Sequence, residues 1–253
     1  MTATPPTAAS GIGNRENGMP RHHPSDALLV GYGAGSLREG VSLVVTLHLL
    51  GCPDCRAALA VAEAVGGAML EDLPPARLER VSLSGTLARL DDPPPPSGPP
   101  SRSWTRPWAR RATPGDPFVG GPSVGGPSVP GPLRPYVRSL AAAPWQRLAP
   151  GLRRIELLPR TPDGGWVQLL RIAPGTMLPH HGHGGLEVTA VLSGSFTDEW
   201  GRYRAGDVAE LDADLKHQPI ADGHQECLCV IAAEAPLRFT GWMGRLIQPF
   251  IGF

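Results

Sequence analysis

The chain has 253 residues, enough for one large domain or two modest ones, and its 23 basic residues balance its 23 acidic residues. A neutral total argues against broad electrostatic binding of nucleic acid, because neutralising phosphates needs a surplus of basic side chains. No run of 18 apolar residues exists, and the first residues lack the charged-then-apolar pattern of a secretory signal. These features exclude a membrane span and favour a cytoplasmic protein.

Glycine and proline together supply 62 residues (32 + 30), a level near that of low-complexity chains. The excess is local, because residues 92–135 contain 14 of the prolines and 7 of the glycines, including the run Pro93–Pro96. Within this segment Gly-Gly-Pro-Ser-Val occurs twice, at 120–124 and 125–129. Such a segment cannot bury a core, so we expect a Pro/Gly-rich linker.

The linker divides the chain into regions of different character. Residues 1–20 are small and polar, and we expect a disordered N-terminal extension. Residues 21–91 are rich in alanine, leucine and valine with helical spacing, whereas residues 136–253 consist of short apolar segments between turns. We therefore predict an α+β multidomain protein with a small all-α domain, the linker at 92–135 and a C-terminal all-β barrel.

Four helices are predicted in the all-α domain. Ser25 or Asp26 can cap the first and Ser36 the second, while Pro53 suits the first position of the third. An amphipathic fourth helix is expected over residues 76–90. A helical domain of about 70 residues is marginal without a staple such as a metal ion.

Seven strands are predicted in the β region, from short apolar segments that recur between turn signals and indicate a sandwich or small barrel. They are Arg153–Leu158, Trp166–Ile172, Glu187–Leu192, Ser195–Glu199, Asp207–Leu211, Glu226–Ala232 and Leu237–Phe239.

Two cysteines and a histidine form a candidate metal site in the helical region. His48 precedes Cys52 by four residues, and Cys52 and Cys55 lie at the start of the third helix, where exposed N–H groups favour thiolates. Two thiolates and one imidazole make three of the four ligands of a tetrahedral zinc site. The fourth candidate is His22 or His23, just before the first helix. A redox C-x-x-C is the alternative, but such a pair normally follows a strand.

This arrangement resembles the zinc-binding anti-sigma domain, and the residues around His22-His23 and Gly66-Gly67 are similar to the ChrR branch of that family. The resemblance implies that the second histidine of the pair, His23, is the fourth zinc ligand. It also implies that the family's own N-terminus lies near Met19. Residues 1–18 are then either a disordered extension or the product of an upstream start codon.

A second group of histidines lies in the β region. His181 and His183 are two residues apart, so both project from one face of a strand, whereas His180 points to the other. Glu187 follows on the same hairpin, and a later hairpin returns His217 to the group. Three imidazoles and one carboxylate inside a barrel are suited to zinc or another divalent first-row metal.

The spacing from Gly175 through His181, His183 and Glu187 to Gly194 resembles the first cupin motif. The second motif departs from the family pattern around His217, which lacks the usual Pro-x-Gly before it and the Asn after it. The later segments, among them Cys227-Leu-Cys229 and Arg245–Phe250, are also similar to ChrR-type proteins. Cys227 and Cys229 lie on the same face of one strand. They are either buried apolar groups or a target of oxidation.

The resemblance implies a function as well as a fold. Proteins of this type are anti-sigma factors, negative regulators of transcription that sequester an extracytoplasmic-function (ECF) sigma factor and release it under singlet oxygen or organic hydroperoxide stress. The helical domain at 21–91 would bind the sigma factor, with residues 76–90 as an additional contact, and the cupin at 136–253 would act as the sensor. We then expect no enzymatic activity, no direct DNA binding and no membrane association.

Two other functional hypotheses belong to different classes of protein. A metal-dependent cupin dioxygenase-like enzyme with an accessory zinc domain would need an open metal position and a substrate pocket. A DNA-binding regulator conflicts with the neutral charge.

The sequence leaves open the cupin metal, the signal, the cognate sigma factor and the oligomeric state. A signal would have to pass through direct docking of the cupin or through proteolysis of the linker.

Overall fold

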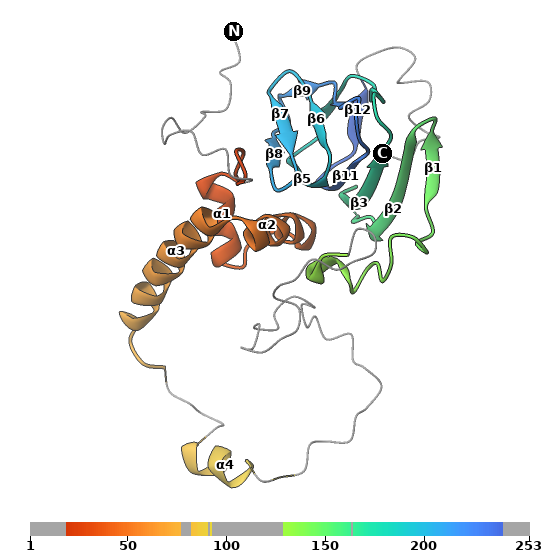
Figure 1. Cartoon of the computed structure of the whole chain (residues 1–253). Helices are drawn as coiled ribbons and strands as arrows, with labels where there is room; N and C mark the ends of the chain where they lie inside the picture. Colours follow the sequence, from red (N-terminus) through yellow and green to blue (C-terminus); the bar gives the residue numbers. More distant parts are fainter. Residues whose placement is uncertain (1–18, 77–81, 91, 93–128, 163, 240–253) are drawn as a thin grey trace.

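The computed structural model describes residues 19–76, 82–90, 92, 129–162 and 164–239 (Figure 1). The proline run, the first Gly-Gly-Pro-Ser-Val repeat, the second repeat up to Ser128 and the C-terminal segment after Phe239 lie outside the described residues. The same holds for most of the predicted N-terminal extension and of the predicted linker.

Three helices pack together in the N-terminal part, and two of their starts confirm the predicted caps. In α1 (Asp26–Gly33) the Ser25 side chain accepts from the Leu28 N–H, and α3 (Pro53–Glu71) begins at Pro53 with Cys52 as its N-cap. The prediction for α2 (Glu39–Gly51) was wrong at its start, because Arg38 is the N-cap. The Ser36 hydroxyl instead donates to the Gly31 carbonyl at the end of α1.

The fourth helix is shorter than predicted. The α4 helix (Leu83–Ala88) has six residues, capped by the Ser82 hydroxyl, and none of them is buried. Part of the predicted 76–90 helix, residues 77–81, lies outside the described residues. In Figure 1 α4 is drawn apart from α1, α2 and α3.

The C-terminal part is an antiparallel cupin-like barrel built from three sheets (Figure 1). The large sheet has the order β1-β2-β3-β11-β5-β8, and the small sheets have the orders β10-β6-β7 and β12-β4-β9. A short 3-10 helix, η1 (Gly131–Leu133), precedes the barrel. The strands are β1 (Gln146–Ala149), β2 (Leu152–Leu158), β3 (Trp166–Ile172), β4 (His181–His183), β5 (Glu187–Ser193), β6 (Ser195–Thr197), β7 (Arg202–Arg204), β8 (Val208–Leu211), β9 (Lys216–His217), β10 (Ile220–Ala221), β11 (Cys227–Ala233) and β12 (Leu237–Phe239).

The large sheet is apolar on both faces because each face covers a different core. In β3, Trp166 and Leu170 point into the barrel, whereas Val167 and Leu169 point outward to the helices. Sheets covered on both sides carry nearly continuous apolar strands. Because of this two-sided burial every residue of β3 except Arg171 is buried, including the polar Gln168.

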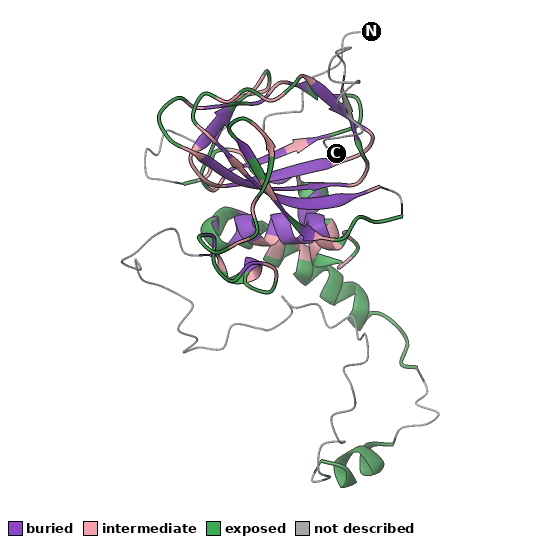
Figure 2. Cartoon of the chain, turned by 90° about the vertical axis from the view of Figure 1, so that its right-hand side faces the viewer, coloured by how far each residue is buried: buried purple, intermediate pink, exposed green. Residues whose placement is uncertain are grey.

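Helix α2 covers the outer face of the large sheet. Leu43, Val44 and Val45 are at most 1% exposed and belong to one apolar core with sheet residues. A methyl group added at Gly40 would lie 2.3 Å from the Val167 side chain, so the backbone of α2 approaches the sheet closely. Figure 2 shows the buried part of the helical layer directly beneath the buried strands.

Polar contacts fix the same interface. The Glu210 carboxylate of β8 accepts hydrogen bonds from the Ser25 backbone N–H (2.8 Å) and hydroxyl (2.9 Å). The Tyr136 hydroxyl donates to Glu39 of α2 at 2.9 Å. The helical part is therefore docked directly on the barrel, which was one of the two routes left open for a signal. A signal does not have to cross the 92–135 segment.

Candidate metal centres

Four side chains from three helical elements meet at the first candidate site. His23 lies just before α1, His48 is in the last turn of α2, and Cys52 and Cys55 lie at the start of α3. The structure brings together the four residues that the sequence analysis selected. His48, Cys52 and Cys55 are buried and His23 is exposed.

The spacing of the donor atoms fits a tetrahedral ion. His23 Nδ1 is 3.3 Å from His48 Nε2 and 3.4 Å from each cysteine sulfur, and His48 Nε2 is 3.2 Å from Cys55 Sγ. With zinc bonds of about 2.0–2.1 Å to nitrogen and about 2.3 Å to sulfur, the N–N and N–S edges of a tetrahedron measure about 3.3–3.6 Å. The observed distances match a zinc ion at the centre of the cluster.

Burial sets the protonation of this cluster when no cation is bound. It raises the pKa of the Cys55 thiol to about 12, with a further contribution from the hydrogen bond to Cys52. The helix start alone therefore does not stabilise a Cys55 thiolate, and a metal ion would supply the missing positive charge. Burial also lowers the pKa of His48, which keeps its imidazole neutral and able to ligate.

A backbone carbonyl of the barrel orients the His48 ring. Its Nδ1 lies 2.7 Å from the Gly206 carbonyl, so Nδ1–H can donate there and leave Nε2 free for a metal. Next to Gly206, the buried Asp207 carboxylate accepts from the backbone N–H groups of Arg21 (2.6 Å) and His22 (3.2 Å). The His22 ring packs on Tyr203 and does not join the cluster. The turn before β8 thus supports the segment that positions His23.

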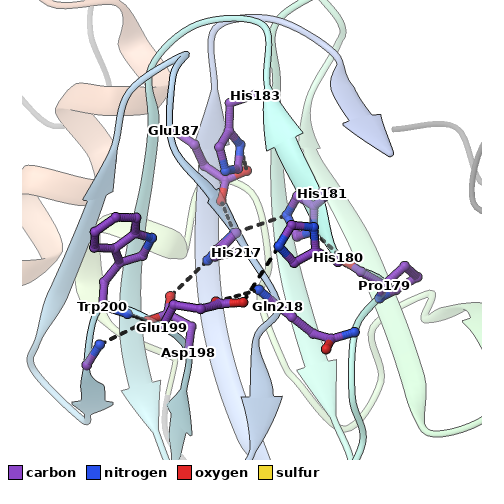
Figure 3. Close-up of polar contacts among 11 residues, drawn as sticks. Pro179, His180, His181, His183, Glu187, Asp198, Glu199, Trp200, His217 and Gln218 are labelled. Carbon is purple, nitrogen blue, oxygen red and sulfur yellow. Dashed lines mark hydrogen bonds and ion pairs between the residues drawn. The ribbon is translucent and has the colours of Figure 1, made fainter. Parts of the chain in front are cut away.

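The second candidate site lies inside the barrel (Figure 3). His181 and His183 project from β4, Glu187 begins β5, and His217 comes from β9, opposite His181 in the strand pairing. All four are buried, and their donor atoms lie within 4.8 Å of one another. His180 is excluded from the group and forms an ion pair with Glu199 at 3.7 Å.

Distances and unpaired atoms support a cation at this site. Nε2 of His181 and Nε2 of His217 are 3.1 Å apart, and His183 Nδ1 is 3.2 Å from Glu187 Oε2. Neighbouring ligands at about 2.1 Å from an ion are about 3.0–3.4 Å apart in octahedral or tetrahedral geometry. Within the described residues His183 Nε2 is buried without a hydrogen-bond partner, as a missing ion would leave it.

Outer contacts orient two of the ligand histidines. His217 Nδ1 lies 2.8 Å from Asp198 Oδ2, and His181 Nδ1 lies 2.7 Å from the Pro179 carbonyl. Asp198 Oδ1 also accepts from the N–H groups of Trp200 and Gly201. A carboxylate behind a histidine fixes its tautomer and strengthens it as a ligand. The sequence analysis missed Asp198, whose signal is an aspartate opening an Asx turn between two short strands.

Electrostatics favour ligation. Burial lowers the pKa of His181 to about 4, so its imidazole is neutral. Burial opposes ionisation of Glu187, but the three histidines outweigh it and hold the pKa of Glu187 below its usual range. The site therefore presents three imidazoles and one carboxylate, the donor set expected for a divalent ion.

A cavity of about 110 Å³ lies beside the barrel cluster. Its walls are apolar apart from Thr189, the Cys229 thiol and three of the cluster's residues, His181, Glu187 and His217. The pKa of Cys229 is raised well above its ordinary value, first by a hydrogen bond with the Cys227 thiol and then by burial. Cys229 is therefore a thiol here. The barrel therefore combines a candidate metal centre with space for a small molecule.

Comparisons with known proteins identify the family. The ChrR cupin-like domain family matches residues 134–236. Anti-sigma-E factor ChrR from Cereibacter sphaeroides is 41% identical over 234 residues, which cover 91% of this chain and 97% of that protein. The crystal structure of Rhodobacter sphaeroides SigE in complex with the anti-sigma ChrR matches with a TM-score of 0.65 and 36% identity. That match covers 85% of this chain and 100% of the other. None of the helices in the described residues is long and apolar enough to cross a membrane. The chain belongs to the ChrR family of anti-sigma factors.

Proposed function

We propose that this protein is a negative regulator of transcription that binds an ECF sigma factor through its helical part. The observation that carries the proposal is the match along almost the whole chain to an anti-sigma factor, together with the similar structure solved in complex with SigE. The working compartment is then the cytoplasm, where sigma factors meet RNA polymerase.

An exposed apolar surface supports the contact with the sigma factor. Val61, Val65 and Met69 follow one another at four-residue intervals along α3, and each is more than half exposed. An exposed apolar stripe of this kind marks a binding surface for a protein partner. In or beside α4, Leu83, Leu87 and Leu90 are also exposed, so this segment offers an additional contact.

A pair of substitutions on α3 tests the proposal. Val65→Asp together with Met69→Asp should weaken binding to the sigma factor encoded beside this protein at least tenfold, because two charges would enter an apolar contact. Gly67→Asp adds one charge roughly 200° around the helix from Val65, where nothing contacts an added methyl group. Calorimetry should find this control close to the unchanged chain. Equal affinity for all three proteins would contradict the proposal.

We further propose that the two clusters bind metal. His23, His48, Cys52 and Cys55 would hold zinc as a structural staple of the helical part. His181, His183, Glu187 and His217 would hold zinc or another divalent first-row ion. Ligation through imidazole nitrogens and one carboxylate oxygen suits such ions. Their role would be to shape the barrel as a sensor.

Release of the sigma factor under singlet oxygen or organic hydroperoxide stress would begin in the barrel. The docked interface supports this route, because Glu187 in β5 pairs with Leu211 at one end of β8, and Glu210 in the same strand accepts from Ser25. The turn before β8 supports His48. A rearrangement at the barrel cluster can therefore reach the zinc cluster through one strand and one turn. To release its partner it must favour the free state by a few kcal/mol.

The alternative is a dioxygenase-like enzyme, and one observation favours it. The cavity borders three candidate metal ligands, which is where a substrate would meet an ion. We propose that this cavity serves sensing rather than turnover. Incubation of the metal-loaded chain with dioxygen and small enolic or diketone substrates should leave them unchanged. Catalytic oxygen uptake would establish the enzyme instead.

A further inference from the structure

The barrel cavity carries an inference about what the sensor binds. We propose that it takes a short aliphatic monocarboxylate whose head group binds the barrel ion and whose chain fills the apolar cavity. This proposal rests on the barrel metal site proposed above.

The size of the cavity limits the ligand. Its volume is about 110 Å³, below the ~150 Å³ of an engineered apolar cavity that holds benzene. A chain of about four or five carbon atoms matches this space. Sugars and polyphenols, which are larger, do not fit without rearrangement of the barrel.

The walls select an apolar body. Leu152, Leu170, Phe196 and Ile231 line the cavity from three strands of the large sheet and from β6, and all are buried. Hydroxyl groups on a ligand would find few partners there, and a buried hydroxyl without a hydrogen bond costs free energy. An aliphatic chain has no such cost and gains from leaving water.

The charge at the inner end selects the head group. Imidazoles that ligate an ion are uncharged, so the Glu187 carboxylate and a divalent ion together leave a net charge of +1. Among its lining residues in the described parts of the chain, the cavity has no Lys or Arg. A single carboxylate on the ion would bring the net charge to zero in an apolar surrounding, where an unbalanced charge is costly. Without the ion, the same carboxylate would be repelled by Glu187.

The position of the ligands supports the orientation. His181, Glu187 and His217 line the cavity as well as the cluster, whereas His183 does not line it. An ion held by these four residues would therefore border the cavity on one side. The head group of the ligand would lie on that side, at the ion, and its chain would point toward Leu178 and Leu148 at the half-buried rim.

A chain-length series tests the proposal. Full-length protein whose metal content has been measured is titrated calorimetrically with acetate, propanoate, butanoate and pentanoate, the weakest by competition. Affinity should rise about fourfold for each added methylene, or about 60-fold from acetate to pentanoate. A flat series would overturn the inference, because it would show an anion bound at the metal without use of the cavity.

A matched pair of variants locates the chain. Leu178→Trp should fill the cavity from its rim and remove the gain from chain length. Met177→Trp places the same side chain one residue earlier, on a residue that is 58% exposed and outside the lining, and should retain the wild-type series. Equal pentanoate affinity in both variants would overturn the proposal. A chain with no ion in the barrel would refute the metal site itself, whereas a metal-loaded chain with a flat series would refute only the ligand.

Discussion

The two candidate metal centres differ in donors, position and surroundings. The helical cluster combines two thiols with two imidazoles, and all four corners of a tetrahedron are protein atoms. The barrel cluster combines imidazoles with a carboxylate and borders a cavity. In the proposed function, the first centre would hold three helices together and the second would meet a small molecule. Strand β8 connects the two clusters, because it pairs with Glu187 of β5 and its Glu210 accepts from Ser25.

The largest expected effect comes from breaking the helical centre. Cys55→Ser should abolish zinc binding there and unfold the helical part, because zinc in such sites contributes roughly 10–16 kcal/mol to folding. Metal analysis and circular dichroism measure the two consequences. Cys227→Ala is the control, since Cys227 is also buried but lies in the barrel core. If Cys55→Ser kept its full zinc content, the structural role of this centre would be refuted.

A smaller effect is expected from the outer contact of the barrel centre. Asp198→Asn keeps an oxygen for the N–H groups of Trp200 and Gly201 but replaces the acceptor of the His217 proton. Loss of such a contact typically weakens metal binding roughly 10–100-fold. Competition with a chelator should show this loss for one of two bound ions.

Asp212→Asn provides the control for this measurement. Asp212 closes a similar turn by accepting from the N–H groups of Asp214 and Leu215, but it contacts no ligand histidine. It should bind both ions as the unchanged chain does. Identical chelator curves for Asp198→Asn and Asp212→Asn would show that the outer contact has no influence on the ion.

The smallest effect concerns the connection between the centres. Ser25→Ala removes the N-cap of α1 and one of the two hydrogen bonds to Glu210. Loss of an N-cap costs about 0.5–2 kcal/mol, so the urea midpoint should fall. Ser82→Ala removes the cap of the exposed α4 helix instead and should leave the midpoint unchanged. Equal midpoints would mean that the α1–β8 contact adds no stability.

Local chemistry made much of the fold predictable. Ser25 and Pro53 indicated helix starts because their side chains suit those positions, and the spacing of His181, His183 and Glu187 indicated one strand and the next. The strands β9 and β10 were not predicted, since each has only two residues, too few for a periodic signal. The start of α2 was misplaced because Ser36 could cap a helix but bonds to Gly31 instead.

Long-range contacts could not be predicted from local pattern. The docking of α2 on the sheet depends on side chains about 120 residues apart, and the linker composition gave no sign of it. One signal was present: Val41, Leu43 and Leu47 belong to a helix that is apolar on nearly all sides, and such a helix is normally covered on all sides. Asp198 and Gly206 likewise gain their roles only when distant strands meet.

Native mass spectrometry with the neighbouring sigma factor tests the central claim most directly, that one centre builds the sigma-binding part and the other serves as sensor. The unchanged chain should form a complex that carries two metal ions. His217→Ala should still form the complex with one ion, and Cys55→Ser should form none. Complex formation by Cys55→Ser, or loss of the complex in His217→Ala with its zinc cluster intact, would contradict this division of roles.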